Sequence, residues 1–105
     1  MKKESLPLSS STLSVLKTLG AMIKAARLER GMSQVELSRR LGVSRYTVIA
    51  LEKGEPKVSV GTVFEAATIV GIPLLAEDQR TLHKLATTVA NLASVLPERS
   101  QRKKV

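Results

Sequence analysis

The sequence of 105 residues contains no cysteine, no tryptophan, one tyrosine and one phenylalanine. The lack of cysteine excludes a disulfide framework and any thiolate metal site, and it suits a reducing compartment, so we expect a cytoplasmic protein. Because aromatic residues make up only 2% of the chain, a hydrophobic core must be aliphatic. The length suits one domain with one modest core.

Long hydrophobic runs are also missing. No apolar stretch approaches the ~18 residues of a membrane span, so we expect no membrane partner. The start Met1-Lys2-Lys3 has the charge of a signal peptide. The apolar region that should follow it is interrupted by the serines and threonine of residues 9–12 and by Lys17, so we expect no signal peptide.

The residue patterns of enzymes and metal sites are absent from the sequence. His83 is the only histidine, and there is no HExxH motif, glycine-rich phosphate loop or serine elbow. The adjacent acids Glu77 and Asp78 are better explained as the start of a helix, where negative charge is favourable. We therefore expect no enzyme, no catalytic residues, no metal and no cofactor.

Positive charge is in excess, with a net charge of +8 and a pI near 10.3. Such a balance favours a polyanionic partner. The excess is concentrated at the two ends of the chain, because residues 31–76 carry a net charge of only +1. Charge alone therefore indicates a polyanionic partner but does not locate a binding site.

Hydrophobic periodicity predicts four helices in residues 12–76. Residues 1–11 are expected to be a flexible arm, followed by a long helix that ends near Gly31. Ser33 and Glu36 form a capping-box pattern for a second helix, which Gly42 ends. The buried side of that second helix is expected to consist of Val35, Leu37, Ser38 and Leu41.

A third helix is capped by Ser44 and turns Val48 and Leu51 inward. Ser59 is expected to cap a fourth, which ends at Gly71. The apolar residues 72–76 include a proline and form either an edge strand or a loop. Residues 77–97 form an amphipathic helix with the apolar stripe Leu82, Leu85, Val89, Leu92 and Leu96, and residues 98–105 form a basic tail.

The two helices of residues 33–54 and their glycine-containing turn have the pattern of a helix-turn-helix. Residues 19–72 resemble the lambda-repressor-like family, also called Cro/CI or XRE. The positions that carry the resemblance are Leu19, Ile23, Arg27, Gly31, Met32, Gln34, Leu37, Gly42-Val43-Ser44, Val48, Glu52, Gly54, Ala67 and Ile72. The resemblance implies an all-α bundle of four or five helices that binds double-stranded DNA.

The resemblance also assigns roles to residues of this chain. Arg45, Tyr46 and Ala50 correspond to base-reading positions. Arg45 can contact guanine or a phosphate, and Tyr46 a thymine methyl or a phosphate. The expected phosphate contacts are Gln34, Ser44, Thr47, Lys53 and Lys57, with Thr47 alternatively beside a methyl group. Arg27 and Glu52 match an interhelical ion pair with a structural role.

We expect a homodimer on a palindromic operator, because two linked half-sites raise affinity. About thirty residues outside the bundle are too few for a small-molecule effector domain. Residues 58–76 also resemble HipB-type antitoxins, which repress their own operon and bind a HipA-like kinase toxin, and in which a strand pairs across the dimer. The expected dimer or partner contacts are Ile72, Leu74, Leu75, Leu85, Val89 and Leu92.

Three functions remain open from the sequence. The first is an autoregulating antitoxin of a HipBA-like operon, and the second is a stand-alone phage or housekeeping repressor. The third is an interaction module that has lost DNA binding. The helix of residues 77–97 can pack on its own bundle, join the dimer or hold a toxin.

Overall fold

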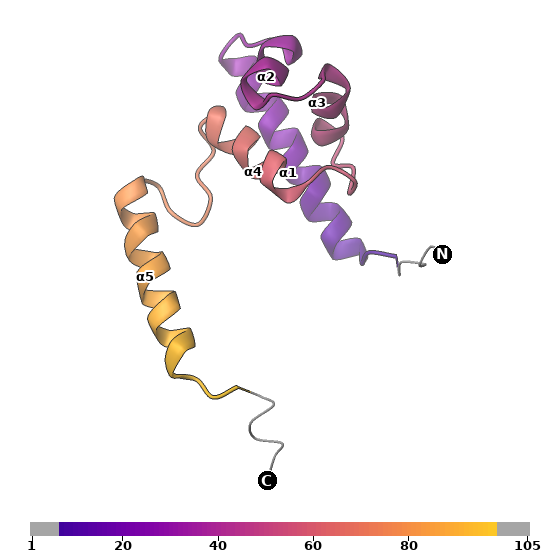
Figure 1. Ribbon diagram of the computed structural model, residues 1–105. Helices are drawn as coiled ribbons and strands as arrows, with labels where there is room; N and C mark the ends of the chain where they lie inside the picture. Colours follow the sequence, from indigo (N-terminus) through magenta and orange to yellow (C-terminus); the bar gives the residue numbers. More distant parts are fainter. Residues whose placement is uncertain (1–6, 99–105) are drawn as a thin grey trace. The chain divides into compact units, whose positions relative to one another are not determined.

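The structure, a computed structural model, describes residues 7–98 of the chain. These residues form five helices, α1 (Ser10–Glu29), α2 (Gln34–Leu41), α3 (Arg45–Glu52), α4 (Val60–Ile69) and α5 (Gln79–Val95) (Figure 1). The chain divides into a unit that ends at Ile72 and contains α1 to α4, and a second unit that begins at Pro73 and contains α5. The expected basic tail lies outside the described residues apart from Glu98, and most of the expected N-terminal arm does too.

Serine caps start all four helices of the first unit. The hydroxyls of Ser9, Ser33, Ser44 and Ser59 each accept the backbone N–H of the residue three positions later. The caps predicted at Ser33, Ser44 and Ser59 are confirmed. The expected start of α1 at Thr12 is wrong, because Ser9 caps the helix and residues 10–11 are helical instead of belonging to an arm.

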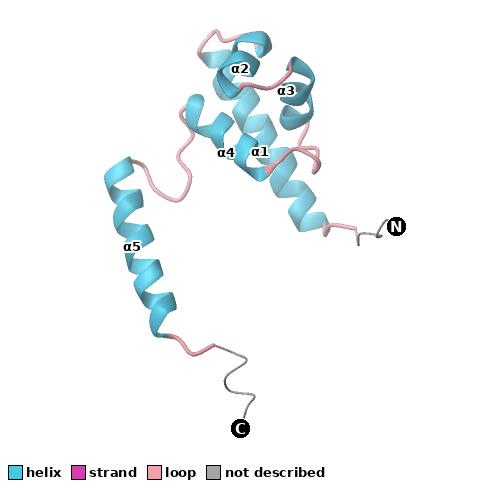
Figure 2. Ribbon diagram, viewed as in Figure 1, coloured by secondary structure: helices cyan, strands magenta, loops and turns pink. Residues whose placement is uncertain are grey.

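An aliphatic core joins α1 to α4, in which α3 packs on α1 and α2, and α4 packs on the same two helices. Its largest fully buried side chains are Ile23, Leu37, Val48 and Val70. The predicted all-α bundle is confirmed, and residues 7–98 contain no strand, as Figure 2 shows. Val35 was expected in the core but is 43% exposed.

A close approach of the α1 and α3 backbones fixes the position of α3 relative to α1. A Cβ atom at Gly20 would lie 2.5 Å from the carbonyl oxygen of Leu51 and 2.7 Å from that of Glu52. Only glycine allows this approach. The chain then leaves α3 through Gly54, which has a φ of +77° and packs against the Lys17 backbone.

Residues 72–76 adopt the loop alternative in the single chain. Leu75 has a φ of +69°, and the only pairing is an isolated bridge between Leu74 and Ala76 on either side of it. This tight turn replaces the extended backbone that an edge strand requires. Ile72 and Leu74 are half-buried, whereas Leu75 is 85% exposed.

The second unit consists mainly of α5. Asp78 is the N-cap of α5, and its carboxylate accepts the backbone N–H of Thr81 at 2.7 Å. That hydrogen bond lowers the pKa of Asp78 from its ordinary value of 3.8. The predicted acidic helix start and the amphipathic helix are both confirmed. The stripe residues Leu85, Val89 and Leu92 are exposed in the single chain.

Candidate nucleic-acid interface

The helices α2 and α3 present a short turn and an exposed helix start. Gly42 ends α2 in the left-handed conformation with a φ of +72°, and Ser44 caps α3 two residues later. Val48 and Leu51 anchor α3 in the core, which leaves its first turn outside. Tyr46 is 77% exposed and the adjacent Arg45 is exposed as well.

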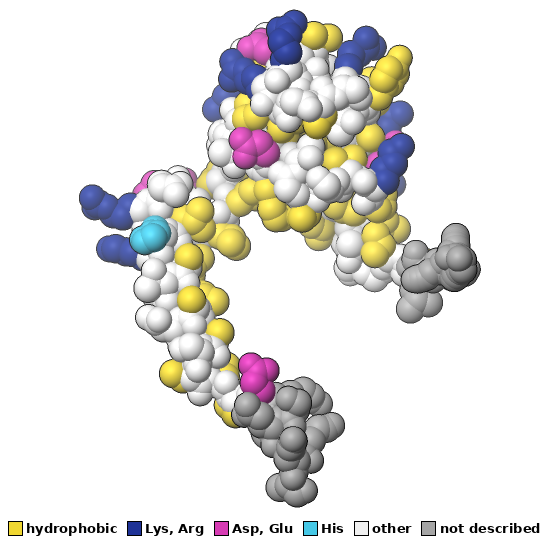
Figure 3. All heavy atoms as spheres, viewed as in Figure 1, with side chains coloured by type: hydrophobic (Ala, Val, Ile, Leu, Met, Phe, Trp, Pro, Cys, Tyr) yellow, Lys and Arg dark blue, Asp and Glu magenta, His cyan; other side chains and the backbone are white. Residues whose placement is uncertain are grey.

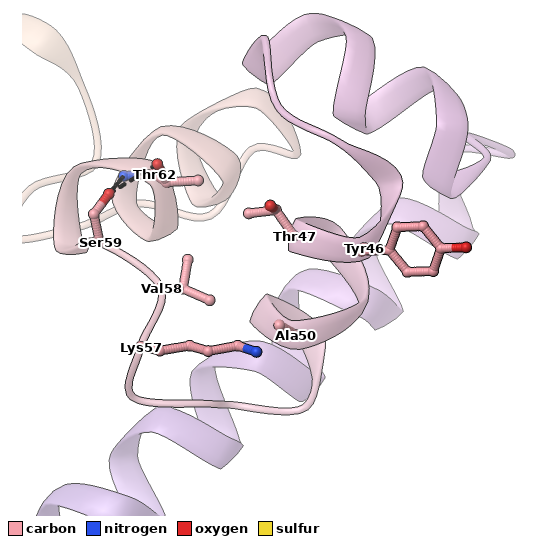
Figure 4. Close-up of a pocket in the computed structure, with 7 residues that line it drawn as sticks. All are labelled: Tyr46, Thr47, Ala50, Lys57, Val58, Ser59 and Thr62. Atoms are coloured by element: carbon pink, nitrogen blue, oxygen red, sulfur yellow. Dashed lines mark hydrogen bonds between the residues drawn. The ribbon is translucent and has the colours of Figure 1, made fainter.

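An open groove lies beside this first turn, between α3 and the start of α4 (Figure 4). Val58 extends into it from the loop, and the methyl groups of Thr47 and Thr62 point toward it from opposite sides. The hydroxyls of both threonines are hydrogen-bonded to the capping serines Ser44 and Ser59. The groove is therefore lined by methyl groups, although polar residues form much of it.

Ala50 is buried, with 6% exposure, and its methyl group lines this groove. A base-reading position is expected to project from α3 toward solvent, and Ala50 does not. The loop of residues 54–58 folds back over this side of α3, where the Glu55 N–H donates to the Ala50 carbonyl at 3.0 Å. Any contact from Ala50 to a ligand must therefore be made through the groove.

Arg27 and Glu52 form a buried, bidentate ion pair between α1 and the last turn of α3. Arg27 Nε and Nη2 donate to the two carboxylate oxygens at 2.6 and 3.0 Å. Only 6% and 4% of the two side chains are exposed. Arg27 Nη1 also donates to the Met32 carbonyl at 2.9 Å, so the pair ties α1, α3 and the α1–α2 loop together.

Gln34 joins this network from the first turn of α2. Its Nε2 donates to Glu52 Oε1 at 3.1 Å, and the side chain is half-buried. A primary amide has two donor hydrogens, so one remains for an external acceptor. The ion pair thus positions the amide that the sequence analysis assigned to a phosphate.

The expected phosphate-contacting lysines lie at the far end of α3 and in the loop after it. Lys53 is the exposed C-cap residue of α3. Lys57 is exposed and lies 3.4 Å from Glu55, a weak surface pair. Figure 3 shows Lys and Arg side chains spread over the α2 and α3 end of the bundle.

Other types of site find no support in residues 7–98. No group of three or more His, Asp or Glu side chains lies close enough to hold a metal ion. No helix in this range has both the length and the apolar character needed to cross a membrane.

Comparison with known proteins shows the family to which this chain belongs. A family model described as helix-turn-helix matches residues 23–75, which include the whole of α2, α3 and α4. The chain belongs to this helix-turn-helix family.

Three relatives support the assignment. An uncharacterized HTH-type transcriptional regulator of Methanocaldococcus jannaschii is 36% identical over 52 residues, 50% of this chain and 79% of that protein. A second such regulator, from Methanothermobacter thermautotrophicus, is 42% identical over 50 residues, 48% of this chain and 72% of its own length. The cryptic phage CTXphi transcriptional repressor RstR of Vibrio cholerae is 34% identical over 61 residues, 56% and 55% of the two chains.

The helix-turn-helix surface includes residues whose place in it was not predicted from the sequence. Val58, Ser59 and Thr62 line the groove, and Glu55 lies beside Lys57. The capping pattern at Ser59 indicated the start of α4. No local pattern indicated that the loop before it folds back against α3.

Proposed function

We propose that this helix-turn-helix protein is a transcriptional repressor that binds a specific double-stranded DNA sequence through α3. The observation that carries the proposal is the exposure of Arg45 and Tyr46 on the first turn of α3. This turn is the part of a recognition helix that contacts base edges in the major groove. The similarity to a phage transcriptional repressor supports repression as the mode of regulation.

Arg45 is the proposed guanine contact, since its guanidinium can donate to O6 and N7 of one base, worth about 1–3 kcal/mol of discrimination. Tyr46 contacts a neighbouring base or phosphate. The methyl-lined groove accepts a thymine methyl group, contacted by Thr47 and Ala50. Gln34, Ser44, Lys53 and Lys57 contact phosphates on either side.

The proposed binding form is a homodimer on a palindrome. A dimer places two copies of α3 about 34 Å apart, one turn of B-DNA, and links two weak contacts into a stronger one. Apolar residues that are exposed in the single chain, among them Leu75 and Val89, support a protein–protein interface in addition to the DNA-binding surface.

Two biological settings fit this repressor. The resemblance of residues 58–76 to HipB-type antitoxins supports an autoregulating antitoxin with a kinase toxin as its partner. Similarity to a phage repressor supports a protein that acts alone. Purification of the tagged chain from its native lysate separates them: an antitoxin brings down a kinase-like protein encoded beside it, and a stand-alone repressor brings down DNA only.

The test of DNA reading is selection of bound sequences from a random duplex library, followed by titration of the selected site. We expect Arg45→Ala and Tyr46→Ala each to weaken binding at least about tenfold. Arg45→Lys keeps the charge but loses the bidentate contact, so it separates guanine reading from phosphate contact. Lys24→Ala removes an exposed charge from α1 and is the matched control.

Further measurements test the groove and the role of α3 separately. Deoxyuridine in place of thymine at a contacted position removes only the methyl group, and weaker binding at one such position supports the groove assignment. A double variant of Arg45 and Tyr46 with unchanged affinity for the selected site would show that α3 does not read bases. Failure to select any sequence would favour an interaction module.

A further inference from the structure

The apolar stripe of α5 has the spacing of a coiled-coil seam. Leu82, Leu85, Val89, Leu92 and Leu96 are separated alternately by three and four residues, which places them at successive a and d positions of a heptad. Figure 3 shows hydrophobic side chains along one side of α5 and polar atoms along the other. The stripe lies beyond residues 23–75, so the helix-turn-helix match says nothing about it.

The borders of the stripe carry no charge. The neighbouring e and g positions hold the small or neutral residues Thr81, Ala86, Thr88 and Ala93, together with Val95. The cations of α5, Arg80 and Lys84, are at outer heptad positions near its start. A partner with a charged seam would find no counter-charge here, whereas a second copy of the same neutral stripe meets no repulsion.

Charge also distinguishes the two possible orientations. In a parallel pair the capping carboxylates of the two Asp78 residues, one at the start of each α5, lie at the same end of the seam. An antiparallel pair separates these like charges by the length of α5, about 25 Å, which exceeds the Debye length of about 8 Å.

We propose that α5 pairs with α5 of a second copy of this chain as an antiparallel two-helix coiled coil centred at the level of Thr87, midway along the helix. Leu82 then lies opposite Leu92 of the second copy, and Leu85 lies opposite Val89, so that each a position faces a d position. The interface is isologous, as the two-fold symmetry of a dimer requires. This inference rests on the homodimer proposed above and adds its interface and orientation.

The first test is the mass of the full-length protein by sedimentation at about 1 and about 100 μM, since dimerisation follows mass action. We expect Val89→Lys to weaken the dimer at least about 100-fold, because an unpaired charge is buried in the seam. Thr87→Lys adds the same charge on the outer face and is the matched control, expected to dimerise like the wild type. Lysine has a higher helix propensity than valine, and circular dichroism checks that α5 persists.

Single cysteines test the orientation, because the chain has none of its own. In the antiparallel pair, Leu82→Cys and Leu92→Cys do not cross-link alone on oxidation, but an equimolar mixture of the two gives the mixed disulfide dimer. Facing residues in the seam are close enough for the bond, and residues at opposite ends are not.

Each other outcome overturns the inference at a different level. A wild-type protein that stays monomeric at about 100 μM refutes both this interface and the proposed homodimer. A dimer unaffected by Val89→Lys refutes the α5 interface and leaves the homodimer standing. Self-cross-linking of Leu82→Cys refutes the antiparallel orientation. Loss of the dimer through Thr87→Lys as well shows that the stripe is not its specific surface.

Discussion

Removing one partner of the Arg27–Glu52 ion pair should destabilise the bundle strongly. In Arg27→Met the Glu52 carboxylate loses two of its three hydrogen bonds while its side chain stays 4% exposed. Leaving such a charge buried without its partner costs about 3–5 kcal/mol, against a total of about 5–15 kcal/mol for a native domain. At roughly 4–8 °C for each kcal/mol, the melting temperature should fall by at least about 12 °C.

The double variant Arg27→Met/Glu52→Leu should recover much of this loss. It removes both charges and leaves two polar groups without a partner, the Met32 carbonyl and the Gln34 amide. An unsatisfied group costs about 1–3 kcal/mol when buried, and the half-buried Gln34 can turn to water. We therefore expect the double variant to lose about 1–3 kcal/mol, far less than the sum of the single variants.

Urea denaturation of the full chain, followed by circular dichroism at 222 nm as the probe of helix content, measures all three free energies. The matched control is Glu36→Gln, which breaks the Arg40–Glu36 pair. That pair has a similar distance of 2.8 Å but side chains 51% and 41% exposed. It should cost less than about 0.5 kcal/mol. Additive single losses, or a loss below about 1 kcal/mol for Arg27→Met, would refute the reasoning.

Three further predictions concern α1, the α3–α4 loop and α5. Gly20→Ala should cost about 2 kcal/mol or more in thermal melts because its Cβ meets the α3 carbonyls, whereas Gly61→Ala, with open space around it, should be neutral or stabilising. Glu55→Gln should raise affinity for the selected DNA about 2–5-fold by freeing Lys57, and Lys57→Gln should lower it. The Asp78 cap of α5 should hold at neutral pH and be lost as the pH falls through a pKa below 3.8, seen as a shift of the Thr81 amide signal in NMR.

Each of these predictions has an outcome that contradicts it. Equal melting temperatures for Gly20→Ala and Gly61→Ala would show that α1 can move away from α3 at no cost. Unchanged affinity of Glu55→Gln at low salt would show that Lys57 is far from phosphate. The sign for Asp78 follows from its lowered pKa, since the carboxylate is the capping form, so Asp78→Asn should abolish the acid transition while keeping the cap.

Local chemistry explains why so much of the fold was predictable. A serine cap, an apolar period of 3.6 and a terminal glycine are properties of a few neighbouring residues, so α2 and α3 follow from the sequence alone. Ser9 was missed because Ser10, Ser11 and Thr12 follow it, and the pattern offers several equivalent starts. Val35 was misplaced because an eight-residue helix has too few turns to define its buried face.

The site depended on contacts that local patterns do not contain. The burial of Ala50 results from the loop of residues 54–58, whose path is set by Gly54 packing on α1. The hydrogen bond from Gln34 to Glu52 joins residues 18 positions apart and depends on the angle between α2 and α3. The left-handed conformation of Leu75 is unusual for a branched residue, and no residue preference predicts it.

The separation between the core side of α3 and its exposed first turn has an evolutionary consequence. Val48, Leu51 and Glu52 hold the helix in place, while the side chains of Arg45 and Tyr46 make no hydrogen bond or ion pair among residues 7–98. If these two residues read DNA as proposed, substitutions there change the preferred target sequence with little penalty in folding. Proteins that share this scaffold are then free to diverge in target sequence while inheriting the same thermal tolerance.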